Sequence, residues 1–320
     1  MINVATIGSS IITEAFARAV TQVDGIALHT ATSRDADRAV EIARRIGAPH
    51  AASDLDAVLA DPEIDAVYVG SPNSVHAEQI RAALAAGRHV FVEKPAVDSE
   101  QEWIALTREA TQRGLVLMEG MRMAYDPGIG VVRDLLPTLG VLRRASLHYG
   151  KRSSRYDDVL AGRRVNIFDP AMGGGALADL GVYSVHAAML LFGRPDTVQA
   201  LDVPIASGAD GAGVALLGYP GLVVDVSYSK ITNAGRPSEI EGEQATLSID
   251  DLVSPRRVVR HAVDGDREAV EIPEERHSLR GEVERFVALV EAEGTAAAED
   301  QERTRLTLET MARIRAALAR

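Results

Sequence analysis

The first 120 residues alternate short apolar runs with segments whose apolar positions recur at helical spacing. Residues 2–7 are largely apolar and end at Gly8, which is typical of a short buried strand. Over 12–23, apolar residues follow at spacings of four, four and three, so one face of a helix is apolar. The alternation continues with strands predicted at 26–32, 66–70, 89–92 and 115–120 and helices at 35–46, 73–86 and 99–113. This rhythm predicts right-handed crossovers and a mostly parallel sheet covered on both faces.

The rhythm changes after about residue 122. Several strands without helical segments between them are predicted over 196–272, which is typical of an antiparallel sheet. We therefore predict an α/β chain with two domains, a doubly wound domain over 1–121 and an α+β domain over 122–320 with a large, mostly antiparallel open sheet. The other predicted elements are helices at 128–136, 176–192, 279–293 and 299–318, a strand at 141–149 and a loop over 151–170, with the final helices packing back on the first domain.

Composition narrows the class of protein. The 320 residues carry 34 basic and 46 acidic side chains, a net charge of −12, which disfavours binding to nucleic acid or to anionic lipid. The absence of cysteine excludes disulfides and thiolate chemistry. The chain shows no basic leader, and no apolar run approaches the ~20 residues of a spanning helix. We expect a cytoplasmic protein with no nucleic-acid or membrane partner, and with no metal because no H-x-x-H spacing occurs.

The turn after the first predicted strand is where a dinucleotide fingerprint, G-x-G-x-x-G, would lie. The sequence there keeps only the first glycine, with Ser10 where the backbone would approach phosphate and Thr13 where helix and strand would pack. A serine hydroxyl can still bind phosphate, so the motif by itself is weak evidence for a nucleotide. The residues that we expect to contact a cofactor here are Gly8, Ser9, Ser10, Ile11 and Ile12.

The end of the second strand bears on which cofactor binds. Ser33 and Arg34 stand where a site for the 2′-phosphate of NADP places a hydroxyl and a guanidinium, whereas an NAD site places a carboxylate. Asp35 lies one step late and is predicted to cap the next helix. Arg34 is alternatively a solvated residue at the helix start. The pattern predicts NADP(H) in preference to NAD(H), which stays possible.

Three further motifs follow in order along the chain. The first follows one predicted strand and is Ser71-Pro72-Asn73-Ser74-Val75-His76, in which Asn73 is predicted to cap a helix. The second follows the next strand and is Val92-Glu93-Lys94-Pro95. The third is Gly174-Gly175-Ala176-Leu177-Ala178-Asp179-Leu180-Gly181-Val182-Tyr183. Together they resemble the glucose–fructose oxidoreductase, inositol dehydrogenase and rhizopine-catabolism (Gfo/Idh/MocA) family, with its P-N-x-x-H, E-K-P and G-G-x-x-x-D-x-G-x-[HY] patterns. The resemblance extends over essentially the whole chain.

The resemblance implies a Rossmann domain followed by a domain with a large open sheet, and an NAD(P)-dependent oxidoreductase. It implies that Lys94 contacts the reacting hydroxyl or carbonyl, where an ammonium stabilises a developing alkoxide. Glu93 is expected to orient Lys94 or the cofactor ribose, and Asn73 to touch that ribose. The other residues of these two motifs that we expect to line the cofactor site are Ser71, Pro72, His76 and Lys94. His76 is either a secondary proton relay or a residue that holds the loop. We also predict a cis Lys94–Pro95 bond.

Asp179 and Tyr183 are four residues apart on one predicted helix and therefore share a face. Many family members have a histidine at the second position as proton donor and acceptor, whereas the tyrosine here resembles the branch of the dimeric dihydrodiol dehydrogenase. The resemblance implies that Tyr183 takes this role here, and that Asp179 orients Tyr183 or Lys94. A phenol has an ordinary pKa near 10, which a neighbouring ammonium such as Lys94 would lower. The alternatives are that Tyr183 is only a packed aromatic residue and that His186 is the acid and base.

Other polar residues carry weaker expectations. Arg122 and Tyr125, near the predicted domain boundary, are candidate substrate contacts, and Arg122 is alternatively a clamp between domains. Lys230 lies on a predicted strand of the second domain, where it either faces the cleft or is solvated, and the solvated lysine is favoured. The basic loop over 151–156 is expected to pair with the acidic residues that follow it rather than with an anionic substrate.

The predicted reaction is the interconversion of a secondary alcohol and a ketone or lactone on a sugar, polyol or cyclic diol. Two other functions stay open because the family contains both: a regulator that binds NAD(P) without turnover, and a glycosidase that uses a tightly held cofactor. The glycine motif, which keeps only its first glycine, favours the regulator. The presence of Lys94, Asp179 and Tyr183 argues against a regulator, because binding without turnover does not need them. The partner is a small molecule, and we expect a homo-oligomer, a dimer, formed through the sheet of the second domain.

Overall fold

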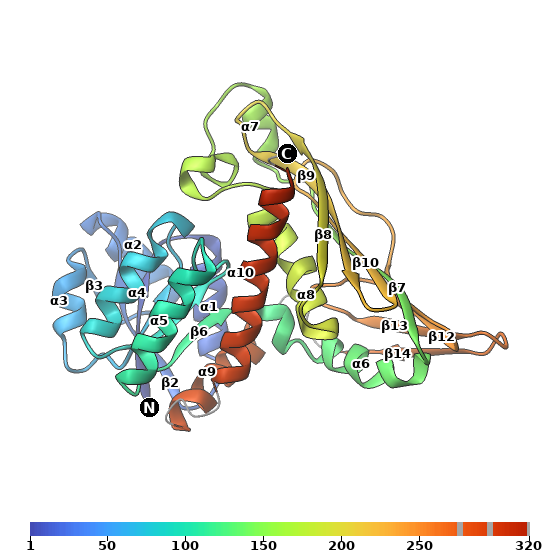
Figure 1. Ribbon diagram of the computed structural model, residues 1–320. Coiled ribbons are helices and arrows are strands. Elements are labelled where there is room, and N and C mark those ends of the chain that lie inside the picture. Colours follow the sequence, from blue (N-terminus) through green and yellow to red (C-terminus); the bar gives the residue numbers. More distant parts are fainter. Residues whose placement is uncertain (274–277, 293–296, 319–320) are drawn as a thin grey trace. The chain divides into compact units, whose positions relative to one another are not determined.

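The computed structural model describes residues 1–273, 278–292 and 297–318, which divide into two compact units (Figure 1). Unit 1 comprises Met1–Met121 and Ser278–Arg305, and unit 2 comprises Arg122–His277 and Leu306–Arg320. The last helix, α10 (Ala298–Leu318), therefore contributes its first part to unit 1 and the rest to unit 2.

Unit 1 contains a six-stranded, entirely parallel sheet in the order β3-β2-β1-β4-β5-β6. This confirms the predicted parallel sheet, and the order is that of a Rossmann fold, in which ligands bind where the order reverses, between β1 and β4. Its strands are β1 (Ile2–Ile7), β2 (Ile26–Thr32), β3 (His50–Ala52), β4 (Ala66–Val69), β5 (His89–Glu93) and β6 (Leu117–Gly120). β3 has only three residues and no buried face, which is why the hydrophobic pattern did not predict it.

Helices cover both faces of this sheet. α1, α2 and α9 pack together in one layer, and α4 packs on α5 in another. Between layer and sheet, Phe16 stacks on Tyr68 with ring centroids 3.9 Å apart, and Phe91 meets both rings edge-on. The helices of unit 1 are α1 (Ile11–Val20), α2 (Ala36–Ile46), α3 (Leu55–Ala60), α4 (His76–Ala85), α5 (Glu100–Gln112) and α9 (Arg280–Glu291).

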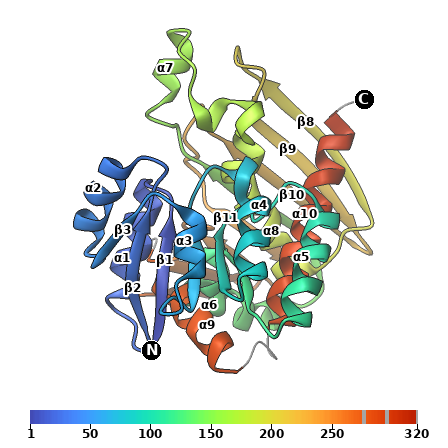
Figure 2. The same cartoon turned by 90° about the vertical axis from the view of Figure 1, so that its left-hand side faces the viewer.

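Unit 2 contains an eight-stranded sheet in the order β14-β13-β12-β11-β7-β10-β9-β8. All neighbours are antiparallel except β7 and β10, which run parallel, so the predicted mostly antiparallel sheet is confirmed. Figure 2 shows β8 and β9 side by side at one edge. The strands are β7 (Leu142–Gly150), β8 (Thr197–Pro204), β9 (Asp210–Tyr219), β10 (Leu222–Ser229), β11 (Ser238–Gly242), β12 (Ala245–Ile249), β13 (Arg257–Ala262) and β14 (Arg267–Glu271).

The long connections of unit 2 are helical. α8 (Val182–Phe192) packs on β7 and β10, and it continues a π-helical turn, η6 (Leu177–Gly181). The other helices are η2 (Arg122–Tyr125), α6 (Pro127–Leu135), η3 (Leu136–Leu139), α7 (Tyr156–Leu160), η4 (Asn166–Phe168) and η5 (Pro170–Met172).

One helical stretch among the described residues, Pro170–Phe192, is long and apolar enough to cross a membrane by length and composition alone. The expectation that no apolar run approaches that length was therefore wrong. The most apolar window of this stretch is 72% buried inside the protein. Such burial is what a core helix shows, because a helix that is apolar all round must be covered.

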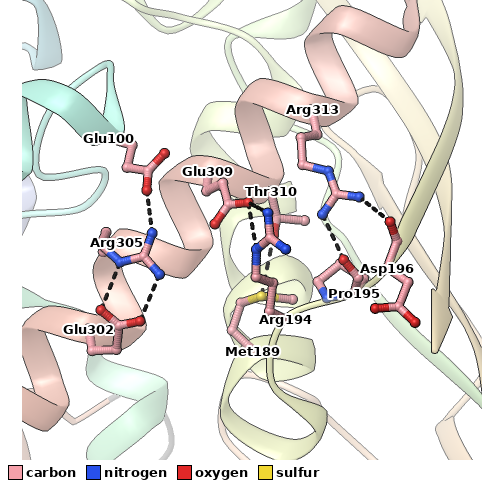
Figure 3. Close-up of polar contacts among 10 residues, drawn as sticks. All are labelled: Glu100, Met189, Arg194, Pro195, Asp196, Glu302, Arg305, Glu309, Thr310 and Arg313. Atoms are coloured by element: carbon pink, nitrogen blue, oxygen red, sulfur yellow. Dashed lines mark hydrogen bonds and ion pairs between the residues drawn. The ribbon is translucent and has the colours of Figure 1, made fainter. Parts of the chain in front are cut away.

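Polar side chains hold α10 within each unit (Figure 3). In unit 1, Arg305 binds Glu100 at the start of α5 and Glu302 on its own helix. In unit 2, Arg194 just after α8 pairs with Glu309, and Arg313 donates to the carbonyl oxygens of Pro195 and Asp196. These contacts explain why a helix of 21 residues is divided between two compact units.

Candidate functional site

The predicted cofactor residues lie at the carboxyl ends of four strands that are neighbours in the sheet, β2, β1, β4 and β5. Backbone bonds join these ends, from Gly8 N–H to the Thr32 carbonyl and from Gly70 N–H to the Ile7 carbonyl. The structure therefore brings together the segments 8–12, 33–34, 71–76 and 93–94, which the sequence analysis selected separately.

The loop after β1 shows why a single glycine is sufficient. Gly8 has a φ of +117°, and a Cβ there would lie 2.5 Å from the Gly70 carbonyl oxygen, so only glycine fits. Thr13, where the fingerprint has its third glycine, is buried against Gly70, whose own Cβ would meet Thr13 Oγ1 at 3.0 Å. The close approach of helix to strand is thus obtained from a glycine that directly follows β4. The signal for this compensation in the sequence was Gly70, directly after the strand.

The start of α1 fits a bound pyrophosphate. Within the described residues, Ser10 at the helix start places no side-chain bond on the amides of the first turn. The Thr13 amide donates to the Ser10 carbonyl oxygen, which leaves the Ile11 and Ile12 amides to bind an anion. Ser10 Oγ instead lies 3.4 Å from Thr13 Oγ1 and 3.5 Å from the Gly70 carbonyl. Ile11 beside it is exposed. The glycine cradle and the open helix start are what an NAD(P) cofactor needs.

A residue that the sequence analysis missed lies next to this loop. Arg38, in the first turn of α2, donates from Nε to Ser9 Oγ at 2.7 Å. Arg34 is exposed at the end of β2, and Asp35 accepts from the Arg38 amide, as a helix cap should. The predicted cap is confirmed. Arg38 lies six residues after the end of β2 and four after Arg34. A second basic residue four positions after Arg34 was the available signal.

His76 links two of the strand ends. It is fully buried at the start of α4, with Nε2 2.9 Å from the Ser71 carbonyl oxygen and Nδ1 3.2 Å from the Pro95 carbonyl oxygen. Burial lowers the pKa of His76, which favours the neutral ring. A neutral ring carries a single N–H, so His76 donates to one of these two carbonyl oxygens while its ring fills the space between the loop after β4 and the turn after Lys94. This position fits the alternative in which His76 holds the loop. Asn73 does not cap α4 as predicted, because it opens a 3₁₀ turn, η1 (Asn73–Val75), and α4 begins only at His76.

The strand β5 ends at Glu93, and half-buried Lys94 follows it. The Lys94–Pro95 bond is cis, as predicted. Glu93 is buried and accepts a hydrogen bond of 2.8 Å from the Tyr68 phenol.

Glu119 on β6 holds the chain just beyond Lys94. Its two carboxyl oxygens accept from the Ala96 amide and the Thr304 hydroxyl, each at 2.9 Å. Burial raises the pKa of Glu119 to about 7, which the two hydrogen bonds oppose. A buried carboxyl group on β6 is therefore part of the support for the Lys94 turn.

In unit 2, Asp179 lies in the π-helical turn and Tyr183 in the first turn of α8. The Tyr183 ring packs edge-on against Tyr149 of β7 at 5.5 Å, and the Arg122 guanidinium lies over it at 5.3 Å from the ring centroid. Arg122 is therefore a cation beside the phenol, and the role expected of Lys94 there stays a prediction. π-Helical turns are frequent at functional sites because they displace side chains from regular helical positions.

Two other residues of unit 2 have clear surroundings. His186 is buried, with Nδ1 3.1 Å from Thr307 Oγ1 on α10. Lys230 was expected to be solvated, but only 1% of its surface is exposed and its ammonium lies 2.7 Å from Asp179 Oδ2. The expectation for Lys230 was wrong because a strand-end lysine shows its partner only in three dimensions.

The remaining candidates are Tyr125 and the basic loop over 151–156. Tyr125 closes η2 and is half-buried. In the basic loop, Arg152 pairs with Asp157 and Arg155 with Asp158, as expected.

A pocket of about 510 Å³, a size typical of small-molecule sites, lies where β7 and β10 end, and its lining residues include Tyr149, Tyr228, Thr232 and Asn233. Over the described ranges, no three His, Asp or Glu side chains gather as a metal site.

A Rossmann unit with a glycine cradle, followed by a unit with a carboxylate and a phenol on one helical segment, is the architecture of an NAD(P)-dependent oxidoreductase acting on CH–OH groups. Residues 2–121 match the oxidoreductase family with an NAD-binding Rossmann fold, and residues 138–248 match the GFO/IDH/MocA C-terminal domain. The chain belongs to this GFO/IDH/MocA oxidoreductase family, as the sequence motifs predicted.

Individual relatives share most of the chain. It is 37% identical to scyllo-inositol 2-dehydrogenase (NADP(+)) IolU of Bacillus subtilis, over 91% of this chain and 88% of that protein. It is 31% identical to D-xylose 1-dehydrogenase (NADP(+)) 2 of Haloferax volcanii, over 84% and 83%. Among solved structures, the 3-ketoreductase KijD10 of Actinomadura kijaniata, in complex with NADP and TDP-benzene, superposes with a TM-score of 0.87 at 25% identity, over 99% of this chain and 98% of that one.

Proposed function

We propose that this oxidoreductase prefers NADP(H) and interconverts a secondary alcohol and a ketone or lactone on a sugar, polyol or cyclic diol. Unit 1 is the cofactor domain in this proposal and unit 2 the substrate domain. The observation that carries it is the π-helical turn that presents Asp179 four residues before Tyr183, with the Arg122 guanidinium over the phenol ring. Relatives named as NADP(+)-dependent inositol and xylose dehydrogenases support the same substrate class.

Each side chain has a chemical role in the proposal. Bound nicotinamide supplies the hydride acceptor or donor. Tyr183 Oη takes the hydroxyl proton of the alcohol, or returns it to the ketone. Arg122, over the ring, stabilises the phenolate that results. Lys94 donates to the reacting oxygen and stabilises its developing negative charge. The hydrogen bond of His186 to Thr307 supports Tyr183, rather than His186, as the acid and base.

The preference for NADP(H) is supported by the charge at the end of β2. Arg34 and Arg38 are both exposed there, Ser33 supplies a hydroxyl, and Arg38 is fixed by its bond to Ser9. A 2′-phosphate is bound by such a group of guanidinium and hydroxyl donors. Asp35, which follows Arg34 in the sequence, is engaged as the cap of α2.

The test is cofactor titration by fluorescence with NADPH and NADH, followed by a turnover screen of sugars, polyols and cyclic diols. We expect NADPH to bind more tightly and Tyr183→Phe to lower turnover by about 10²- to 10⁴-fold. Binding of neither cofactor would overturn the proposal, and so would full turnover by Tyr183→Phe. Binding without turnover of any substrate would indicate a regulator. Cleavage of an aryl glycoside without added cofactor would indicate a glycosidase.

We also propose that the enzyme is a cytoplasmic homo-oligomer, formed through the outer face of the unit 2 sheet. The cysteine-free sequence, which needs no disulfide, supports the location. The strands β8, β9 and β10 expose five apolar residues on one face, Leu201, Val203, Val214, Leu216 and Val223. Such a patch commonly marks an interface. Leu216→Glu should reduce the mass measured by light scattering, whereas Leu160→Glu, on α7, should not; an unchanged mass for Leu216→Glu contradicts this interface.

A further inference from the structure

Lys230 is a buried cation just after strand β10. The chain has only three lysines, Lys94, Lys151 and Lys230, among 34 basic residues, so nearly all of its cations are arginines. Lys230 is 1% exposed. Burying an ammonium is unfavourable unless it is paired and hydrogen-bonded. The partners of Lys230 therefore indicate what it does.

Three groups surround the ammonium. Nζ lies 2.7 Å from Asp179 Oδ2, donates to the Ile167 carbonyl oxygen at 2.9 Å, and lies 4.6 Å from the centroid of the Phe168 ring. The carbonyl and the ring come from the segment before the π-helical turn, and the carboxylate comes from the turn itself. A cation held from two segments in this way has a fixed position.

Asp179 differs from its partner in exposure. Its side chain is 38% exposed, while that of Lys230 is 1% exposed. One carboxylate oxygen is thus held by the buried ammonium while the side chain remains accessible to a ligand. β10 also packs directly against this turn through Tyr228. Gly181 lies so close to the Tyr228 ring that a Cβ on it would be 2.8 Å from the ring.

We propose that Lys230 is a positioning residue, which holds the Asp179 carboxylate ionised and in one orientation so that it accepts a hydrogen bond from a substrate hydroxyl beside Tyr183. The inference rests on the proposed roles of Asp179 and Tyr183. A lysine suits this place because its charge is compact, whereas the larger, planar guanidinium of arginine needs a different arrangement of acceptors. Lys230 itself contacts no reacting atom.

The principal test is a double-mutant cycle on turnover of the substrate found in the screen. Lys230→Met keeps the length of the side chain and removes its charge, and Lys151→Met is the matched control on an exposed lysine. We expect Lys230→Met to lower kcat by about 10- to 100-fold and leave NADPH affinity unchanged. In an Asp179→Asn background the same change should have little further effect. Multiplicative effects in the double variant would overturn the inference, and so would unchanged kcat in Lys230→Met.

The pH profile separates positioning from a general loss of packing. Without its cation, Asp179 takes up a proton more easily, so the acid limb of kcat/KM in Lys230→Met should move to higher pH by about one to three pH units. An acid limb at the wild-type position contradicts the inference.

A third readout does not depend on activity. With ¹⁵N-labelled lysine, NMR of the wild-type protein should show three side-chain ammonium signals, of which the Lys230 signal exchanges slowly with water and shifts in Asp179→Asn. Rapid exchange of that signal overturns the inference even if Lys230→Met fails to fold. Tyr183→Phe, measured in parallel, keeps the two proposals apart: full turnover there overturns the proposed function, while the ammonium signal still reports the Lys230–Asp179 pair.

Discussion

The Arg38 guanidinium donates a hydrogen bond of 2.7 Å to Ser9 Oγ, which joins the first turn of α2 to the loop after β1. Two segments that each form part of a nucleotide site are thereby held together by a cation. Arg38 also follows Arg34 by four residues, just beyond the end of β2, where a 2′-phosphate is expected.

Arg38→Ala should therefore weaken NADPH binding by about 10- to 100-fold, because a charge-assisted hydrogen bond to phosphate is lost. NADH binding should change much less, since NADH lacks that phosphate. Fluorescence titration of both cofactors measures the two dissociation constants. Exposed Arg44, in the last turn of α2, provides the control Arg44→Ala. Equal losses for NADPH and NADH would show that Arg38 only supports the loop.

His76→Asn should impair turnover more than cofactor binding. The shorter side chain no longer fills the space between the Ser71 and Pro95 carbonyl groups, which the ring nitrogens of His76 contact, so the Lys94 turn loses one of its supports. We expect kcat to fall by about 10- to 100-fold, as for a displaced catalytic group, with a far smaller change in NADPH affinity. Steady-state kinetics together with titration test this. A raised dissociation constant with normal kcat would place the role of His76 in cofactor binding instead.

Glu119 should make stability depend on pH. Because burial raises its pKa from 4.5 to about 7, the folded protein retains a proton that the unfolded chain has lost between these values. The free energy of unfolding therefore falls as pH rises from about 4.5 to about 7, by up to about 3 kcal/mol from this group. Glu119→Gln should remove that slope and exposed Glu78→Gln should not. Denaturant unfolding at pH 5 and 7.5 compares the variants, and equal slopes in wild type and Glu119→Gln would refute the prediction.

Asp126 and Arg256 form a buried, two-pronged ion pair in unit 2, with N–O distances of 2.8 and 2.9 Å. Asp126→Ala leaves the guanidinium buried without its counter-charge, and this should cost about 3–5 kcal/mol of stability. Asp157→Ala removes the partner of Arg152 from an exposed pair and should leave stability unchanged. Thermal unfolding of both variants tests the contrast, and similar melting temperatures would contradict it.

Much of the fold could be predicted from the sequence because the signals were local. The parallel sheet of unit 1 followed from apolar runs alternating with helical spacing, and the Asp35 cap from a residue type at a helix start. Short elements were missed, since the three residues of β3 carry no periodic pattern. The start of α4 was misplaced because Asn73 suits a 3₁₀ turn as well as a helix cap.

The sequence by itself determined the family, the two kinds of sheet and the segments that carry Lys94, Asp179 and Tyr183, because these depend on residues close together in the chain. Only the tertiary structure decided that Gly70 compensates for Thr13, that Arg38 reaches Ser9, that Glu119 supports the Lys94 turn and that Lys230 is buried on Asp179. Each of these pairs joins residues at least 20 positions apart. Contacts of this kind arise from how strands and helices pack, and no spacing along the chain encodes them.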